Sequence, residues 1–138
     1  MSETVVHYQG SLRCRAEHAE SGTVVITDAP KDNHGKGESF SPSEMLAVSL
    51  GSCILSIMAI AAQSMDLDIT GSTATIEKEM ANAPRRFSKL AVTVHVPYSL
   101  NEEQVRRLER AAHACPVHNI LKPEIDAAIS FRWDSHCG

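Results

Sequence analysis

The chain has 138 residues, of which 43% are hydrophobic and 22% charged, and its formal net charge is -4. This length is close to the commonest domain size, so residues 1–138 are expected to form one domain with a buried core. A mildly acidic chain without a cluster of lysine and arginine argues against nucleic acid, or an anionic membrane surface, as the main partner.

The opening residues, MSETVVHYQG, lack the basic segment and the apolar run of a secretory signal, which favours a cytoplasmic location. Thiols in the cytoplasm are kept reduced. A structural disulfide framework is therefore not expected, and any bridge would be transient and catalytic. The four cysteines are Cys14, Cys53, Cys115 and Cys137.

Residues 3–28 contain three β-rich runs, and the last two are separated by a turn at AESG. The alternation of apolar and polar residues from Leu12 to Glu17 predicts a strand with one face in the core. The polar, glycine-containing segment 29–40 is expected to be a loop.

A long helix is predicted to begin at SPSE. Ser41 can cap it, Pro42 suits its first position, and Glu44 can complete a capping box by accepting a hydrogen bond from the Ser41 amide. Residues 45–62 are apolar or small on every side, which predicts burial on every side. A membrane span is the alternative, but no basic or aromatic belt flanks the run. Because one small domain cannot surround such a helix, we expect a homodimer in which each chain covers the helix of the other.

Two runs with strand alternation, 72–80 and 87–97, flank the turn NAPRR and predict an antiparallel hairpin. An amphipathic helix follows, and Pro116 ends it and opens a short new helix. The run 127–133 is the last predicted strand. This order of elements predicts an α+β fold and lacks the βαβ rhythm of a parallel sheet. The amphipathic helix has two possible capping boxes, Asn101 with Gln104 or Ser99 with Glu102.

Two cysteines occupy positions that favour chemistry. Cys115 directly precedes Pro116 at a predicted helix N-terminus, where the helix dipole and free amides stabilise a thiolate and lower the pKa of a thiol. Cys53 lies in the middle of the apolar helix, in LGSCIL. Either residue could instead be a small hydrophobic member of the core.

A metal site and a hydrolase site are weaker alternatives. Zinc could bind Cys115 with His113 and His118, perhaps joined by His136 and Cys137, but no CxxC pair is present and Pro116 interrupts the helix between the two histidines. The sequence SLGSC is not a Gly-x-Ser-x-Gly elbow, so a hydrolase triad is not predicted.

Four segments carry a family resemblance. FSPSEMLAVSLGSCILSIMAIAA, PRRFSKLAVTVHV, LERAAHACPVHNIL and ISFRW resemble, in that order, the osmotically inducible protein C and organic hydroperoxide resistance superfamily. The resemblance covers most of the chain. It implies a cytoplasmic, intertwined homodimer of α+β fold, with antiparallel sheets packed on two central helices and the active site at the dimer interface.

The same resemblance implies a thiol peroxidase. Cys53 corresponds to the peroxidatic residue, whose thiolate attacks a hydroperoxide and becomes a sulfenic acid. Cys115 corresponds to the resolving residue, which forms a disulfide that a lipoyl-type or other dithiol reduces. This chemistry requires no metal or flavin cofactor. An apolar surround would favour organic hydroperoxides over hydrogen peroxide.

The chain departs from the family pattern at the acid. Well-characterised members have a glutamate directly after the helix-start proline, and it acts with an arginine to activate the peroxidatic thiol. Here Ser43 follows Pro42, and Glu44 comes one residue later. On a helix, Glu44 and Cys53 are roughly 13 Å apart along the axis, so Glu44 could act only across the dimer.

The arginine is also not fixed by the sequence. Arg13 is the favoured candidate because its strand matches the N-terminal region of the family, and Arg15, Arg85 and Arg86 are the alternatives. These departures keep a second function open, namely a redox-sensing or small-ligand-binding dimer without peroxidase turnover.

Overall fold

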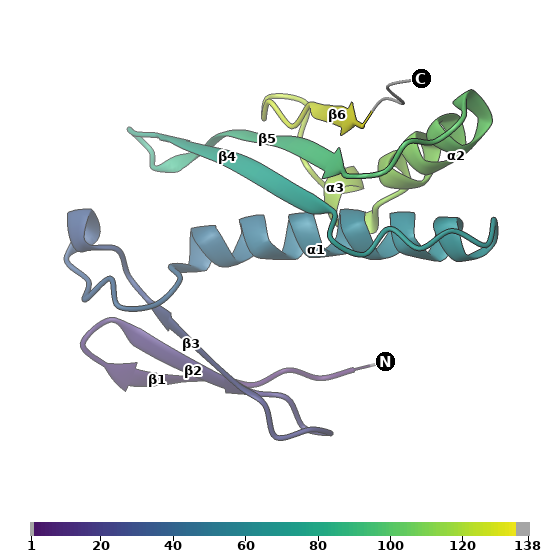
Figure 1. The fold of residues 1–138 in the computed structure, drawn as a ribbon. Coiled ribbons are helices and arrows are strands. Elements are labelled where there is room, and N and C mark those ends of the chain that lie inside the picture. The colour runs from purple at the N-terminus through teal and green to yellow at the C-terminus, as the bar shows by residue number, and fades with distance from the viewer. Residues whose placement is uncertain (1, 135–138) are drawn as a thin grey trace. The chain divides into compact units, whose positions relative to one another are not determined.

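The computed structural model describes residues 2–134 and divides into two compact units, the first ending at Leu46 and the second beginning at Ala47 (Figure 1). His136 and Cys137, which the sequence analysis considered as further metal ligands, lie outside the described residues. Each unit has its own three-stranded sheet.

The first unit is an antiparallel sheet in the order β1-β2-β3, followed by a loop. All three predicted strands are present, as β1 (Val6–Gly10), β2 (Arg13–Glu17) and β3 (Val24–Asp28). The predicted loop contains one short 3-10 helix, η1 (Lys31–Asn33). Gly35 is required there, because a Cβ at this position would lie 1.7 Å from the carbonyl oxygen of Ala29.

Helix α1 (Pro42–Gln63) starts where the sequence predicts and continues into the second unit. The capping box is confirmed: the Glu44 amide donates to Ser41 Oγ, and the Ser41 amide donates to Glu44 Oε1, each at 3.1 Å. The two bonds satisfy amides that a helix start otherwise leaves without partners.

The second unit is built on a hairpin of β4 (Thr73–Ala81) and β5 (Arg86–Val96), which pair antiparallel as predicted. Alternate residues of β5 face the core, and the buried ones are Leu90, Val92, Val94 and Val96. Helix α1 packs on β4, since a Cβ placed on Gly51 would lie 3.1 Å from Ile76 Cδ1 and 3.5 Å from Ala74 Cβ.

The amphipathic helix is α2 (Glu102–His113), and its capping box uses Asn101 and Gln104 rather than the alternative pair. Leu108 and Ala112 on its apolar face are buried. The chain then breaks at Cys115 and continues as α3 (Pro116–Asn119), as Pro116 predicts.

The direction of the last strand corrects one prediction. β6 (Ile129–Trp133) pairs parallel with β5, from Val92 with Ile129 to Val96 with Trp133, so the second sheet is mixed rather than antiparallel. Helices α2 and α3 lie in the crossover between β5 and β6 and return the chain so that β6 can run in the same direction as β5 (Figure 1). A crossover through helices is the connection that parallel neighbours need.

Helix α1 is not buried on every side within one chain. Its buried residues are Leu50, Gly51, Ile54, Met58 and Ala62, whereas Val48 is 39% and Ile60 66% exposed. By length and composition alone this helix could cross a membrane, and 28% of its most apolar window is buried in the chain. Such a helix is also found in the cores of soluble proteins, so this finding by itself is weak evidence for a membrane protein.

Candidate active site

The two predicted redox cysteines meet in the second unit. Cys53 lies on α1 and is half-buried, whereas Cys115 lies between α2 and α3 and is completely buried. The Cys53 side chain lies near enough to the Cys115 thiol to affect its pKa. Both residues are free cysteines in this structure, as is Cys14 on β2. Residues 62 positions apart in sequence are therefore neighbours in the fold.

The backbone of α3 holds the Cys115 sulfur. Cys115 is the N-cap residue, with an extended backbone at φ -61° and ψ 120°, and its Sγ accepts a hydrogen bond from the His118 amide at 3.4 Å. Pro116 has no amide hydrogen, so the donors reach the sulfur from later residues of this short helix.

The predicted low pKa of Cys115 is wrong. Burial raises the pKa of the Cys115 thiol above its ordinary value, and the neighbouring Cys53 side chain raises this pKa further. The amides of His118 and Val117 act in the opposite direction and are outweighed. Because desolvation disfavours a buried thiolate, Cys115 is a neutral thiol at neutral pH.

His118 is a residue that sequence reasoning considered only as a metal ligand. Its Nε2 lies 2.7 Å from the carbonyl oxygen of Ala127, and its ring packs edge-on to His113 with 6.4 Å between centroids. Among residues 2–134, no group of three or more His, Cys, Asp or Glu side chains is arranged to hold a metal ion.

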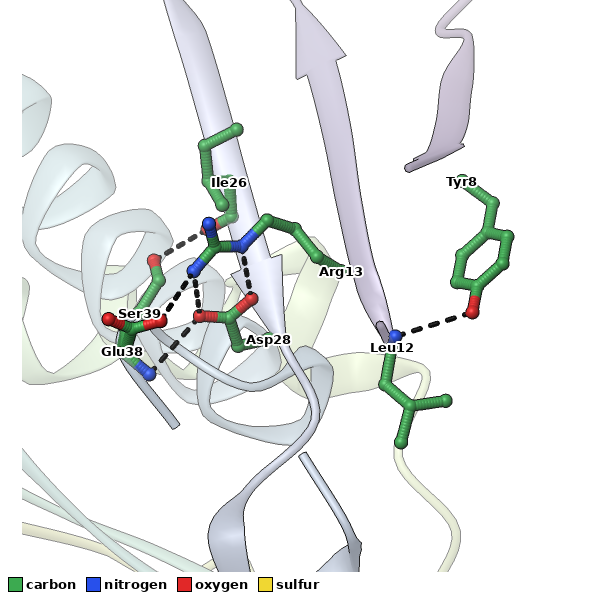
Figure 2. A network of polar contacts seen from close by, with 7 residues as sticks. All are labelled: Tyr8, Leu12, Arg13, Ile26, Asp28, Glu38 and Ser39. Carbon is green, nitrogen blue, oxygen red and sulfur yellow. Dashed lines mark hydrogen bonds and ion pairs between the residues drawn. The ribbon is translucent and has the colours of Figure 1, made fainter. Parts of the chain in front are cut away.

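The predicted activating arginine, Arg13, lies in a polar network of the first unit (Figure 2). It forms two parallel hydrogen bonds with the buried carboxylate of Asp28, from Nε at 2.6 Å and from Nη2 at 2.8 Å. Nη2 also donates to Glu38 Oε1 at 3.2 Å, and the Glu38 amide donates to Asp28 Oδ2 at 3.1 Å. This geometry is the planar, two-bond recognition for which guanidinium is suited.

The network shifts the titration of both charged partners. The hydrogen bonds from Arg13 lower the pKa of the Asp28 carboxyl despite its burial. Asp28 in turn raises the pKa of the Arg13 guanidinium above its ordinary value. Asp28 and Glu38 were not predicted as partners, since only the register that places Arg13 opposite Asp28 reveals the first of them.

The other residues considered for activating the thiol make local contacts with the backbone or with neighbouring side chains, or lie exposed. Glu44 completes the helix cap described above, and its catalytic role stays a prediction. Arg15 Nη1 lies 3.6 Å from Glu17 Oε2. Arg86 donates to the carbonyl oxygens of Asn82 and Pro84 at the hairpin turn. Arg85 is exposed in the same turn.

Comparison with known proteins identifies the family. The model of the OsmC-like protein family matches residues 35–130, which is well over half of the chain. The chain therefore belongs to the OsmC-like family, as the four sequence segments suggested. Among curated proteins, no sequence matches this chain significantly.

Solved structures agree with this assignment. A candidate osmotic stress induced and detoxification response protein from Psychrobacter arcticus 273-4 is 41% identical, with a TM-score of 0.88 over 95% of this chain and 96% of that one. An organic hydroperoxide resistance protein OsmC from Legionella pneumophila is 20% identical, with a TM-score of 0.73 over 96% and 98%. An OsmC-like protein from Mycoplasma pneumoniae is 14% identical, with a TM-score of 0.80 over 97% and 96%. The last two are similar in fold, and membership of the family suggests a redox or peroxide-resistance role.

Proposed function

We propose that this protein is a thiol-dependent peroxidase that reduces organic hydroperoxides. The observation that carries the proposal is the proximity of a half-buried Cys53 to a fully buried Cys115. One cysteine is partly open to a substrate and the other is buried beside it, which is the arrangement expected of a peroxidatic and a resolving cysteine.

The reaction proceeds in three balanced steps. The Cys53 thiolate attacks the terminal oxygen of the hydroperoxide, the O–O bond breaks, and Cys53 becomes a sulfenic acid. The alkoxide leaves as the alcohol after it takes up the proton that Cys53 lost on ionisation. The Cys115 thiol then attacks the Cys53 sulfur, an S–S bond forms, and water leaves. A dithiol reductant of the lipoyl type transfers two electrons and two protons to the disulfide, restores both thiols and itself becomes a disulfide.

The raised pKa of Cys115 supports different roles for the two sulfurs in this mechanism. A neutral Cys115 does not compete with Cys53 for the hydroperoxide, because only a thiolate is a strong nucleophile. Cys115 reacts after Cys53 has been oxidised, and its proton leaves with the hydroxyl group of the sulfenic acid as water.

The working assembly that we propose is a homodimer with the active site at its interface. Support comes from the exposed apolar side chains of α1, among them Val48 and Ile60, which a second copy of the helix would cover. In such a dimer Glu44 and Arg13 would come from the partner chain to activate Cys53. The apolar surroundings favour organic hydroperoxides over hydrogen peroxide, and the location that we propose is the cytoplasm.

A coupled assay with dihydrolipoamide as electron donor tests this function. Wild-type protein should reduce a bulky organic hydroperoxide faster than hydrogen peroxide. Cys53→Ser should reduce turnover by about 1,000-fold or more, because the nucleophile is lost. Cys14→Ser, which removes a thiol from the other sheet, is the matched control and should keep full activity. Full activity in Cys53→Ser would exclude the proposal.

The resolving role needs a separate measurement. Cys115→Ser should leave a sulfenic acid on Cys53 that a dimedone-type reagent traps, and intact mass should show one adduct. If the wild-type protein forms no Cys53–Cys115 bridge after one equivalent of hydroperoxide, Cys115 is not the resolver.

A second candidate function is a redox sensor or small-ligand-binding dimer. Ser43 stands where the best-characterised members carry a glutamate, and Arg13 is already held by two carboxylates in its own unit. Intact mass after stoichiometric hydroperoxide distinguishes the candidates. A bridge without sustained turnover would favour sensing, and no oxidation at all would favour ligand binding.

A further inference from the structure

The short helix that carries Cys115 is too small to hold itself in place. Helix α3 has four residues, and an isolated helix of this length is unstable in water. The geometry of a disulfide is strict, with Cβ atoms about 3.5–4.5 Å apart and a defined dihedral angle. The position of the Cys115 sulfur must therefore be fixed by contacts outside α3.

His118 supplies such a contact. Its amide donates to Cys115 Sγ at 3.4 Å, while its ring nitrogen Nε2 lies 2.7 Å from the carbonyl oxygen of Ala127. A carbonyl oxygen can only accept, so Nε2 must carry the hydrogen. Both the Nε2–H tautomer and the imidazolium ion can donate this bond. One residue thus joins the sulfur to a distant backbone segment.

The segment 126–128, to which the His118 ring is bonded, is itself hydrogen-bonded to β5. The carbonyl oxygen of Asp126 accepts from the Leu90 amide at 2.7 Å, and that of Ala128 accepts from the Val92 amide at 2.9 Å. Leu90 and Val92 are both buried in the core of β5. Ala127, between these two hydrogen-bonded residues, is therefore held next to β5, whose inward-facing residues are buried.

We propose that His118 is a positioning residue that holds Cys115 against Cys53 by tying α3 to the segment 126–128. The proposal rests on the pairing of Cys53 with Cys115 in the proposed function. Its consequence is a high effective concentration of one sulfur at the other, which makes the bridge easy to form. Small displacements of reacting groups can cost orders of magnitude, so the tie should have a measurable effect.

The test is the equilibrium between the dithiol and glutathione redox buffers, measured by peptide mass mapping of the Cys53–Cys115 bridge. One oxidised glutathione becomes two reduced molecules for each bridge formed. In His118→Asn the shorter side chain cannot reach Ala127, and the equilibrium constant for bridging should fall about tenfold, a potential shift of about 30 mV. In His118→Gln the amide nitrogen occupies the place of Nε2, and bridging should return to within about threefold of wild type.

His7→Asn is the matched control, because it makes the same change at an exposed position of β1 in the first unit. It should bridge like the wild type. Melting temperatures of all variants separate positioning from a general loss of structure. Wild-type bridging in His118→Asn, or equal losses in the Gln and Asn variants, would overturn the proposal.

The same experiment distinguishes this inference from the proposed function. If glutathione bridges the wild type as expected but hydroperoxide is not turned over, the peroxidase fails and the role of His118 stands. If glutathione forms no Cys53–Cys115 bridge in the wild type, both are overturned.

Discussion

The two units of this chain are stabilised in different ways. Among the described residues of the first unit, the only fully buried side chains are polar, Asp28 and Ser41. The second unit has an apolar core formed by α1, β5 and α2, and its buried reactive group is a neutral thiol. A buried carboxylate stays ionised when an arginine lies beside it. Burial without a neighbouring cation keeps a thiol in its neutral, protonated form. The surroundings therefore determine the charge that each unit can bury.

The largest expected effect comes from the core of the second unit. Leu90 is completely buried on β5, and Leu90→Ala removes apolar contacts and leaves a cavity. The free energy of unfolding should fall by about 2–5 kcal/mol, measured by urea denaturation. Because no charge is altered, the loss should be the same at pH 4 and pH 7. A loss below about 1 kcal/mol would show that β5 is not the main source of stability.

Breaking the polar network of the first unit should give the next largest loss of stability. Unlike the loss in Leu90→Ala, this one should depend on pH. Asp28→Asn leaves Arg13 without its two-bond partner, and the melting temperature at pH 7 should fall by roughly 5–10 °C. The folded-state pKa of Asp28 is lowered, so its stabilisation is complete above the unfolded pKa and is lost as pH falls through the folded value.

The difference in stability between wild type and Asp28→Asn should therefore shrink on acidification below about pH 4. Glu38→Gln is the matched control, because Glu38 is 65% exposed and surface ion pairs contribute little. A difference that stays constant down to pH 2 would mean that the Asp28 carboxylate does not stabilise the unit through its charge.

A third measurement concerns the buried thiol. In Cys53→Ser, alkylation of Cys115 by iodoacetamide should be about tenfold slower than that of an ordinary exposed thiol at pH 7 and should rise with pH past the usual thiol range. Burial, the larger cause of the raised pKa, remains in this variant. Cys14→Ser serves as the control for mass mapping. Rapid alkylation at pH 6 would show that the α3 amides outweigh burial after all.

The smallest effect is expected at the helix start. Glu44→Gln keeps an acceptor for the Ser41 amide, so stability should change by less than about 0.5 kcal/mol. Ser41→Ala removes the cap and should cost about 1 kcal/mol. If Glu44→Gln keeps its stability but loses turnover about 100-fold, Glu44 is catalytic as well as a cap.

Local rules predicted much of the fold. The capping boxes at Ser41 and Asn101, and the helix that begins after Cys115, depend on residues within one turn of each other. The parallel pairing of β6 was missed, because strand direction depends on a partner more than thirty residues away. The alternation in 127–133 identifies a strand but contains no information on its neighbour.

The candidate site was predictable to a similar degree. The family resemblance paired Cys53 with Cys115, and their roles as a redox pair stay a prediction. The raised pKa of Cys115 could not be predicted from a helix-start motif, because burial is a property of the whole unit. Asp28 was missed for the same reason, since it meets Arg13 only through the register of β2 and β3.

The crossover between β5 and β6 has a consequence for synthesis of the chain. Cys115 lies within this connection, and the segment that anchors it follows at 126–128. A ribosome releases Cys53 long before that anchor, and pairing over such a sequence separation is slow compared with helix formation. An incomplete chain would thus carry two unmatched thiols. In the peroxidase that we propose, docking of the last strand would both finish the fold and hold Cys115 near Cys53, so only a completed chain could turn over hydroperoxide.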